Sequence, residues 1–344
     1  MTEEKSIRPG ESAAVSGSTV VVKVEGAQRR SVIGLVLLGL LAASIMMNVL
    51  LIAATAITPA PVIGVRQMLR EGDAGAKAKL AVIDFTGTIM PPFTDRWIRQ
   101  IRHAREDDSV KGVLLEIDSP GGLVADSHQL YHELQKLTEQ KPVYVAMKRI
   151  AASGGLYIAM AAGAEGKIYI EPTTWTGSIG VIIPRYNAAE LAEKIGVKTE
   201  PLATGPLKGS LSPFRNLRED ERAVWDTIID DAFERFLGVI ADNRSQLDHD
   251  AVRALATGQI YTANQALENG LADENGYSED ALRALAESIG LTKYQVVDYA
   301  APVGLIDVLT GIQEDPPSVI DQLMEAGVPR AFYYCSWNPM VPAQ

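Results

Sequence analysis

The sequence predicts an α/β domain built on a mainly parallel sheet and preceded by one N-terminal transmembrane helix. From about residue 79 onward, short apolar runs rich in β-branched and aromatic residues alternate with longer helical runs. This alternation is typical of parallel strands joined by right-handed helical crossovers. Before it, the stretch 32–57 carries no charged residue. At ~1.5 Å per residue, a helix of that length can cross a bilayer.

The order of the elements follows from the same alternation. Residues 142–147 form a β-branched and aromatic run typical of a buried strand, and 156–162 is small and apolar, as in a buried helix. By this pattern, strands are expected at 80–85, 112–117, 142–147 and 167–170, with one more around 179–183. Helices are expected at 93–106, 124–140, 156–162, 188–195 and 219–243.

The uncharged stretch has two interpretations. Ala54-Thr55-Ala56 resembles the small-residue cleavage site of a secretory signal. However, about thirty mostly polar residues precede the stretch, which is longer than the roughly 7 to 15 apolar residues of a signal peptide. An uncleaved anchor is therefore favoured. Because Arg29 and Arg30 abut its N-terminal end, the N-terminus is expected in the cytoplasm and the main domain outside the cytoplasmic membrane.

The chain divides into five expected regions. They are a cytoplasmic tail at 1–30, a single-pass anchor at 31–58, a linker at 59–78, the α/β domain at 79–300 and a C-terminal extension at 301–344. In the extension, 318–326 reads as an amphipathic helix and the end is rich in aromatic residues. Two roles are open for it: docking on a neighbouring subunit, or reaching the active site as a self-ligand.

Composition excludes several classes of partner and cofactor. The net charge is −11, and residues 1–30 hold five basic and four acidic side chains, which leaves −12 for the remainder. Nucleic acid is therefore not an expected partner. Cys335 is the only cysteine, so neither an intrachain disulfide nor a Cys-rich metal site can form. No phosphate-binding loop or metal-ligand spacing is present, so no cofactor or metal is expected.

The run 151–160 carries the strongest chemical signal. It places Ser153 between an extended apolar run and a helix opened by Gly154 and Gly155. Free N–H groups at a helix N-terminus stabilise an anion, and glycines let a substrate carbonyl approach the backbone. Ser153 is a candidate nucleophile; an N-cap serine before a core helix is the alternative. The small residues around it, Ala151, Ala152 and Gly155, would admit apolar substrate side chains.

A second glycine loop is expected at the same edge of the sheet. Ser119-Pro120-Gly121-Gly122 follows the strand at 112–117, and ligands of parallel sheets bind at the carboxyl ends of strands. Backbone N–H groups there can face a developing oxyanion, and one such donor is worth roughly 3 kcal/mol of barrier. Asp118, just before this turn, places a carboxylate close to the expected oxyanion site.

A serine nucleophile needs a base, and lysine is the better candidate. The histidines His103, His128, His132 and His249 lie in polar segments and are expected to be solvated. Lys208 lies in an apolar and hydroxyl-rich run, 204–214, that contains no acidic residue. A lysine must lose its proton to act as a base, and desolvation lowers its pKa. An ordinary solvated lysine is the alternative.

Five motifs in order resemble the signal peptide peptidase A family, in its short, single-anchor form. They are Asp-Ser-Pro-Gly-Gly at 118–122, the run around Ser153, Thr-Gly-Ser-Ile-Gly-Val at 176–181, Lys208 before Ser-Pro-Phe-Arg, and Gly-Gln-Ile-Tyr-Thr-Ala-Asn-Gln-Ala-Leu at 258–267. The resemblance covers roughly 79–290. It implies a fold of the Clp protease and crotonase superfamily. It also implies a membrane-anchored serine endopeptidase that degrades cleaved signal peptides and other apolar peptides at the outer face of the cytoplasmic membrane.

The resemblance also implies a role for each motif residue. Ser153 would be the nucleophile, Lys208 the general base and Ser178 the residue that orients the lysine. Gly154 and a glycine of the pair Gly121 and Gly122 would form the oxyanion hole. Family members form a homo-oligomeric ring with active sites shared between neighbouring subunits, so a monomer would be inactive. The alternatives are a catalytically silent membrane scaffold of the same fold and a crotonase-like acyl-CoA enzyme.

Overall fold

The computed structural model describes residues 34–48, 65–300 and 332–334, and the chain divides into two units, Met1–Pro61 and Val62–Gln344. The strands of the second unit are β1 Arg66–Gly72, β2 Lys79–Thr86, β3 Val110–Ser119, β4 Gly121–Leu123, β5 Val143–Ala152, β6 Ile168–Ile170, β7 Trp175–Gly177, β8 Ile260–Thr262, β9 Glu274–Asn275, β10 Gln295–Ala300 and β11 Phe332–Tyr334. Its helices are α2 Phe93–Glu106, α3 Val124–Thr138, α4 Gly154–Ala159 with the 3-10 turn Met160–Ala162, α5 Ala189–Lys194, α6 Glu219–Asn243, α7 His249–Leu255, α8 Ala263–Glu268 and α9 Ser278–Ser288.

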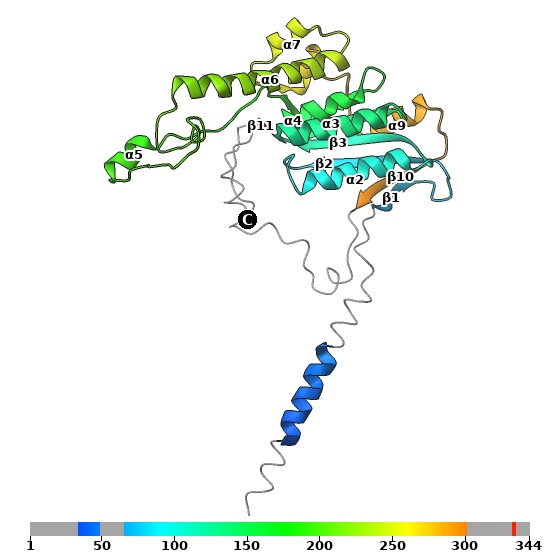
Figure 1. Ribbon diagram of the computed structural model, residues 1–344. Coiled ribbons are helices and arrows are strands. Elements are labelled where there is room, and N and C mark those ends of the chain that lie inside the picture. Colours follow the sequence, from blue (N-terminus) through cyan, green and yellow to red (C-terminus); the bar gives the residue numbers. More distant parts are fainter. Residues whose placement is uncertain (1–33, 49–64, 301–331, 335–344) are drawn as a thin grey trace, which may run out of the picture. The chain divides into compact units, whose positions relative to one another are not determined.

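The sheet is mainly parallel, as expected. Its order is β1-β10-β2-β3-β5-β6-β9, and β7 pairs with both β5 and β8. The pairs from β10 to β9 are parallel, whereas β1 pairs with β10, and β7 with β8, in antiparallel fashion. Together with the flanking helices this is the α/β architecture that the sequence predicts (Figure 1).

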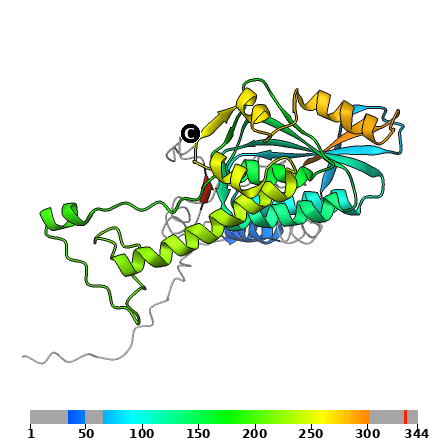
Figure 2. The same cartoon turned by 90° about the horizontal axis from the view of Figure 1, so that it is seen from above.

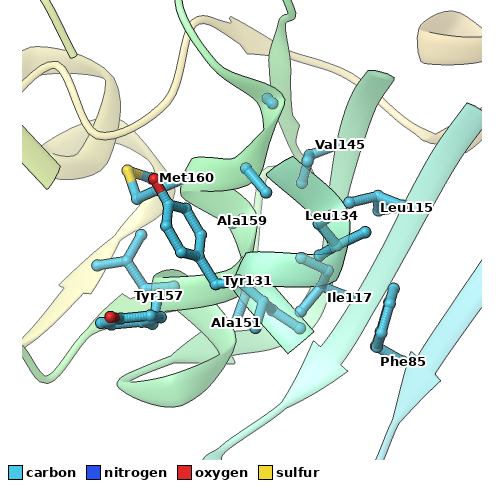
Figure 3. Packing of buried hydrophobic residues seen from close by; sticks show 14 of the residues in the cluster. Phe85, Leu115, Ile117, Tyr131, Leu134, Val145, Ala151, Tyr157, Ala159 and Met160 are labelled. Carbon is cyan, nitrogen blue, oxygen red and sulfur yellow. The ribbon is translucent and has the colours of Figure 1, made fainter. Parts of the chain in front are cut away.

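Side chains alternate between two cores along the central strands. In β2, Ala81, Ile83 and Phe85 face the helices α2, α3 and α4, while Leu80 and Val82 face α9. Strand residues point to opposite faces in turn, so a sheet covered on both sides reads as a continuous apolar run. The first core also holds residues of α6, and Figure 3 shows part of it.

One segment extends away from this body. Residues 184–230, called the arm below, comprise α5, the connection to α6 and the N-terminal half of α6, and both views show it projecting from the sheet (Figures 1 and 2). The buried apolar residues of α6 lie in its other half, from Ala232 to Ile240. Large apolar side chains stay exposed on the arm, namely Tyr186, Leu191, Ile195, Val197, Leu202, Leu207, Phe214, Val224 and Ile228.

Most expected elements are present, and two expectations need correction. The prediction of a strand around 179–183 is wrong. The strand in this region is β7, Trp175–Gly177, and residues 179–183 contain a single bridge position. The stretch 59–78, expected as a linker, contains β1, which pairs with β10 at the sheet edge.

In the first unit, residues 34–48 of the expected anchor form a helix. The rest of 31–58 lies outside the described residues, as does the helix expected at 318–326. Within the described ranges, no helix has both the length and the apolar character needed to cross a membrane.

Candidate active site

The two glycine loops meet at the carboxyl ends of neighbouring parallel strands. β3 and β5 pair so that Ser119 lies opposite Ala151, and the loops with Gly121 and Ser153 follow directly. A Cβ added to Gly121 would lie 2.6 Å from the Gly154 nitrogen, and one added to Gly154 would lie 3.1 Å from the Gly122 nitrogen. Side chains at these positions would separate the loops, so glycine is needed for their close approach.

The backbone at Ser153 is strained, and its hydroxyl is buried. Its φ is 55° and its ψ is −114°. Among the described residues, Ser153 and Ser178 are the non-glycine residues with positive φ. Such strained backbone is typical of functional sites. The Ser153 hydroxyl is fully buried and has no hydrogen-bond partner within the described structure, so it is free to meet a substrate or a base.

The peptide groups of Gly121 and Gly122 point in different directions. The Gly121 N–H donates to Ser119 Oγ at 3.1 Å, and its carbonyl accepts from the Ile89 N–H at 2.9 Å. The Leu123 N–H also bonds the Ile89 carbonyl. Because successive peptide groups of a strand alternate in direction, the Gly122 peptide groups face the opposite side, toward β11. Of the two glycines in this turn, Gly122 is therefore the better candidate to share the expected oxyanion site with Gly154.

Ser178 lies beside Ser153 through the β5–β7 pairing. The Ser153 N–H donates to the Gly177 carbonyl at 2.8 Å, and Ala152 lies opposite Gly177. A Cβ on Gly177 would lie 2.5 Å from the Tyr261 ring and 2.8 Å from the Gln259 carbonyl oxygen. The run that contains Gln259 therefore holds Ser178 in place, and the Ser178 N–H donates to that same carbonyl at 2.7 Å.

Lys208 is not part of this cluster within one chain. It lies between α5 and α6 on the arm, which projects from the body (Figure 2), and its side chain is exposed. The described residues of its own chain therefore do not provide the desolvated surroundings expected for it. Its loop is nevertheless braced, since Arg215 bonds the Gly209 carbonyl at 2.6 Å and Arg218 bonds the Pro206 carbonyl at 3.1 Å. Both arginines also pair with Glu221.

Two known protein families match parts of the chain. The chain matches the Peptidase family S49 over residues 135–292 and the Clp protease family over 74–177. A Synechocystis protein named as the protease slr0021 is 34% identical over 264 residues, which cover 76% of this chain and 92% of that protein. The chain belongs to peptidase family S49. That membership places it among the serine proteases.

Two further relatives of the chain carry the name SppA. An Enterococcus faecium protein named for the signal peptide peptidase SppA is 44% identical over 59% of this chain and 58% of that protein. The chloroplastic serine protease SPPA of Arabidopsis thaliana is 34% identical over 63% of this chain and 32% of that protein. The match thus spans less than two thirds of either of these two relatives.

The carboxylate of Asp118 is compensated in this S49 structure. Asp118 is buried, and Arg149 of β5 donates to it from Nε at 2.5 Å and also from its terminal nitrogen. This contact, chiefly through its hydrogen bond, raises the pKa of Arg149 above its ordinary value. The ion pair ties the strand leading into Gly121 to the strand leading into Ser153. Arg149 was not singled out in the sequence, where it reads as a surface cation.

We expect Arg149→Gln to lower kcat about tenfold, because the buried Asp118 carboxylate would lose its partner and the tie between the strands that lead into Gly121 and Ser153 would be lost. The double variant Asp118→Asn with Arg149→Gln should recover most of that loss. Lys148→Gln, which alters the neighbouring Lys148–Glu116 pair, is the matched control. Steady-state kinetics on one peptide checks this, and a double variant as slow as the single one would contradict the charge argument.

The small residues near Ser153 serve packing. Ala151 lies in the core, and a Cβ on Gly155 would be 2.6 Å from the Ser119 carbonyl oxygen. Ala151 and Gly155 therefore leave no room for apolar substrate side chains, and for these two positions the prediction is wrong. His128 also differs from expectation, because its ring is partly buried against Tyr157 rather than solvated.

Proposed function

We propose that the protein is a membrane-anchored serine endopeptidase that uses Ser153 and Lys208 to degrade signal peptides and other apolar peptides. The observation that carries this proposal is the free, buried Ser153 hydroxyl on a strained turn beside the Gly122 and Gly154 backbone. Membership in family S49 and the names of the relatives support the reaction class.

The chemistry is nucleophilic catalysis. Neutral Lys208 removes the Ser153 proton, and the oxygen attacks a peptide carbonyl whose developing charge faces the N–H groups of Gly122 and Gly154. The lysine ammonium then protonates the leaving amine, which leaves an acyl-enzyme on Ser153. Water, deprotonated by the same lysine, releases the acyl group. Ser178, held beside Ser153 by the β5–β7 pairing, would orient the lysine amine.

Lys208 would come from a neighbouring copy of the chain. Within one chain it is exposed and lies on a projecting arm with many exposed apolar side chains. Surfaces of this kind mark interaction sites. If the arm packs on the next subunit and brings Lys208 to that subunit's Ser153, one contact both buries the apolar residues and desolvates the lysine. Repeating such a head-to-tail contact closes a homo-oligomeric ring.

The membrane anchor and its topology belong to this proposal. The uncharged stretch 32–57, its flanking Arg29 and Arg30, and the names of the signal peptide peptidase relatives support it. The catalytic domain would then stand at the outer face of the cytoplasmic membrane. Its substrates would be apolar segments left there after signal peptides are cut from exported proteins.

Hydrolysis of matched peptides tests the proposed function. We expect the full-length protein in detergent to cleave an apolar fluorogenic peptide at least about tenfold faster than a charged peptide of equal length, since burying an unpaired charge in an apolar site is unfavourable. Equal rates for the two peptides would contradict the substrate class. No hydrolysis by a correctly assembled protein would favour the silent scaffold, and turnover of an acyl-CoA thioester instead would favour the crotonase-like enzyme.

A further inference from the structure

Glu221 is fully buried although it lies on the projecting arm. It occupies the first turn of α6, where the two acidic residues before it, Glu219 and Asp220, are exposed. A carboxylate is rarely buried without partners, because removing its charge from water is unfavourable. Among the described residues of the arm, it is the one charged side chain with no exposure. Its position therefore depends on the groups that surround it.

Two arginines supply the donors around this carboxylate. Arg215 donates from both terminal nitrogens, at 2.8 Å to Oε2 and at 2.6 Å to Oε1 of Glu221, in the paired geometry that matches a carboxylate. Arg218 adds its backbone N–H at 3.1 Å and a terminal nitrogen at 3.1 Å. The side-chain hydrogen bond from Arg215 lowers the pKa of Glu221 to about 2, so the carboxylate is charged at neutral pH. Glu221 thus holds both guanidinium groups at once.

The same two arginines bond the backbone on either side of Lys208. Arg218 donates to the Pro206 carbonyl at 3.1 Å, two residues before the lysine. Arg215 donates to the Gly209 carbonyl at 2.6 Å, directly after the lysine. One buried carboxylate therefore fixes, through two guanidinium groups, the short segment of backbone that carries the candidate base.

Two further contacts in the arm do not replace this link. Asp220 bonds the Arg218 guanidinium at 3.0 Å, but it is exposed and bonds one of the two arginines. The Trp225 indole N–H donates to the Ser210 hydroxyl at 3.0 Å, which holds the part of the loop after the lysine. Among the contacts of the described residues, Glu221 alone joins the supports on both sides of the lysine.

We propose that Glu221 is a positioning residue, which holds the two arginines so that the loop presents Lys208 in one place to the serine of the neighbouring subunit. The inference rests on the proposed function for the role of Lys208, whereas the bracing of the loop does not depend on it. A base must lie within hydrogen-bond reach of the proton that it removes. A displacement of about 1 Å can lower the rate about 100-fold, so a base on an exposed arm needs such support.

Variants of the assembled full-length protein test this role. Glu221→Gln keeps the shape of the side chain but turns an NH2 group toward the arginine donors. Glu221→Asp keeps the charge on a shorter side chain. The matched control is Glu219→Gln, which removes an exposed carboxylate from the same helical turn. Hydrogen exchange measured by mass spectrometry reports on residues 204–214, with residues 143–152 of β5 as the internal standard, and steady-state kinetics on the apolar peptide gives kcat and KM.

We expect Glu221→Gln to exchange at least about tenfold faster than the parent in 204–214, and at the parent rate in 143–152, because charged hydrogen bonds of the loop are lost. Its kcat should fall about 100-fold while KM stays within about threefold, since a base that acts in the chemical step does not hold the substrate. Glu221→Asp should recover at least about tenfold of this loss. Glu219→Gln should match the parent in both measurements.

Arg215→Lys keeps the test decisive if Glu221→Gln does not assemble. Lysine retains the charge but has a single nitrogen, so it cannot bond the Gly209 carbonyl and both Glu221 oxygens as arginine does. We expect the same pattern to a smaller extent, with faster exchange in 204–214, a kcat lowered about tenfold and KM unchanged.

Three results would overturn the inference. They are parental exchange in 204–214 for Glu221→Gln, faster exchange with an unchanged kcat, and an equal loss of kcat in Glu219→Gln. The outcomes also separate this inference from the proposed function. A parent protein that assembles but hydrolyses no peptide would remove the proposed function, while faster exchange in Glu221→Gln would still support the bracing of the loop by Glu221.

Discussion

Replacing Ser153 with alanine is expected to lower kcat/KM for peptide hydrolysis by at least about 10,000-fold, the order of loss seen when a serine nucleophile is removed. The physical reason is that no covalent intermediate can form without the hydroxyl. The fold should be unaffected, because the hydroxyl has no hydrogen-bond partner to lose among the described residues. The measurement is the rate of hydrolysis of an apolar fluorogenic peptide, with assembly checked by size.

Ser288→Ala is the control for this variant. Ser288 lies on α9, where its hydroxyl bonds the Leu285 carbonyl at 2.8 Å, and α9 packs on the other face of the sheet. Its loss should change the rate by less than about twofold, as for surface substitutions in general. A Ser153→Ala protein that keeps more than a hundredth of the parent rate would exclude Ser153 as nucleophile.

Replacing Lys208 tests both its role as the base and the proposed sharing of active sites between subunits. Lys208→Ala is expected to remove hydrolysis as completely as Ser153→Ala, because an alkoxide cannot form without its base. Mixing the two inactive variants should restore activity. In a randomly mixed ring, about one site in four would combine an intact Ser153 with an intact Lys208 from the neighbour. Co-expression of two differently tagged chains, followed by tandem purification and assay, measures this.

The control lysine lies on the same arm. Lys194 ends α5 and is exposed, so Lys194→Ala should leave both assembly and rate unchanged. If the mixed rings assemble but stay inactive, the serine and lysine act within one chain, or Lys208 has no catalytic role. Full activity of Lys208→Ala alone would exclude the dyad outright.

Helices of the body could be predicted closely because their signals are local. The bounds expected for α2 and α6, 93–106 and 219–243, agree with Phe93–Glu106 and Glu219–Asn243. α2 presents Trp97, Ile98 and Ile101 at helical spacing to the core, and acidic residues fill the first turn of α6. Both features depend only on nearby residues and on the helix dipole.

Short strands were less predictable because distant partners define them. β4 is Gly-Gly-Leu, a sequence with little strand propensity, and it counts as a strand only because β11 pairs with it from more than two hundred residues away. β1 is almost wholly exposed and lies at the sheet edge, so it lacks an apolar pattern. The apolar run expected around 179–183 forms no named strand among the described residues, where β8 pairs with β7 instead.

In the candidate site, too, the parts set by local sequence could be predicted and the parts set by distant contacts could not. Ser153 and the glycines could be placed together from the sequence, since both loops follow strand ends in one parallel sheet. Ser178 could be named only through the family resemblance. In the proposed shared site, the position of Lys208 relative to Ser153 depends on how copies of the chain assemble, which no local pattern encodes. The ring contacts among Tyr157, Phe236 and Tyr333 join three separate parts of the chain, which no local pattern predicts.

Covalent labelling of the assembled full-length protein with a fluorophosphonate tests the central claim most directly. A serine activated by a neutral lysine beside two backbone N–H donors should react, and peptide mapping by mass spectrometry should place the adduct on Ser153. Lys208→Ala should stay unlabelled in the same ring. An adduct on another serine, or hydrolysis of peptides by a protein that never labels at Ser153, would contradict the account.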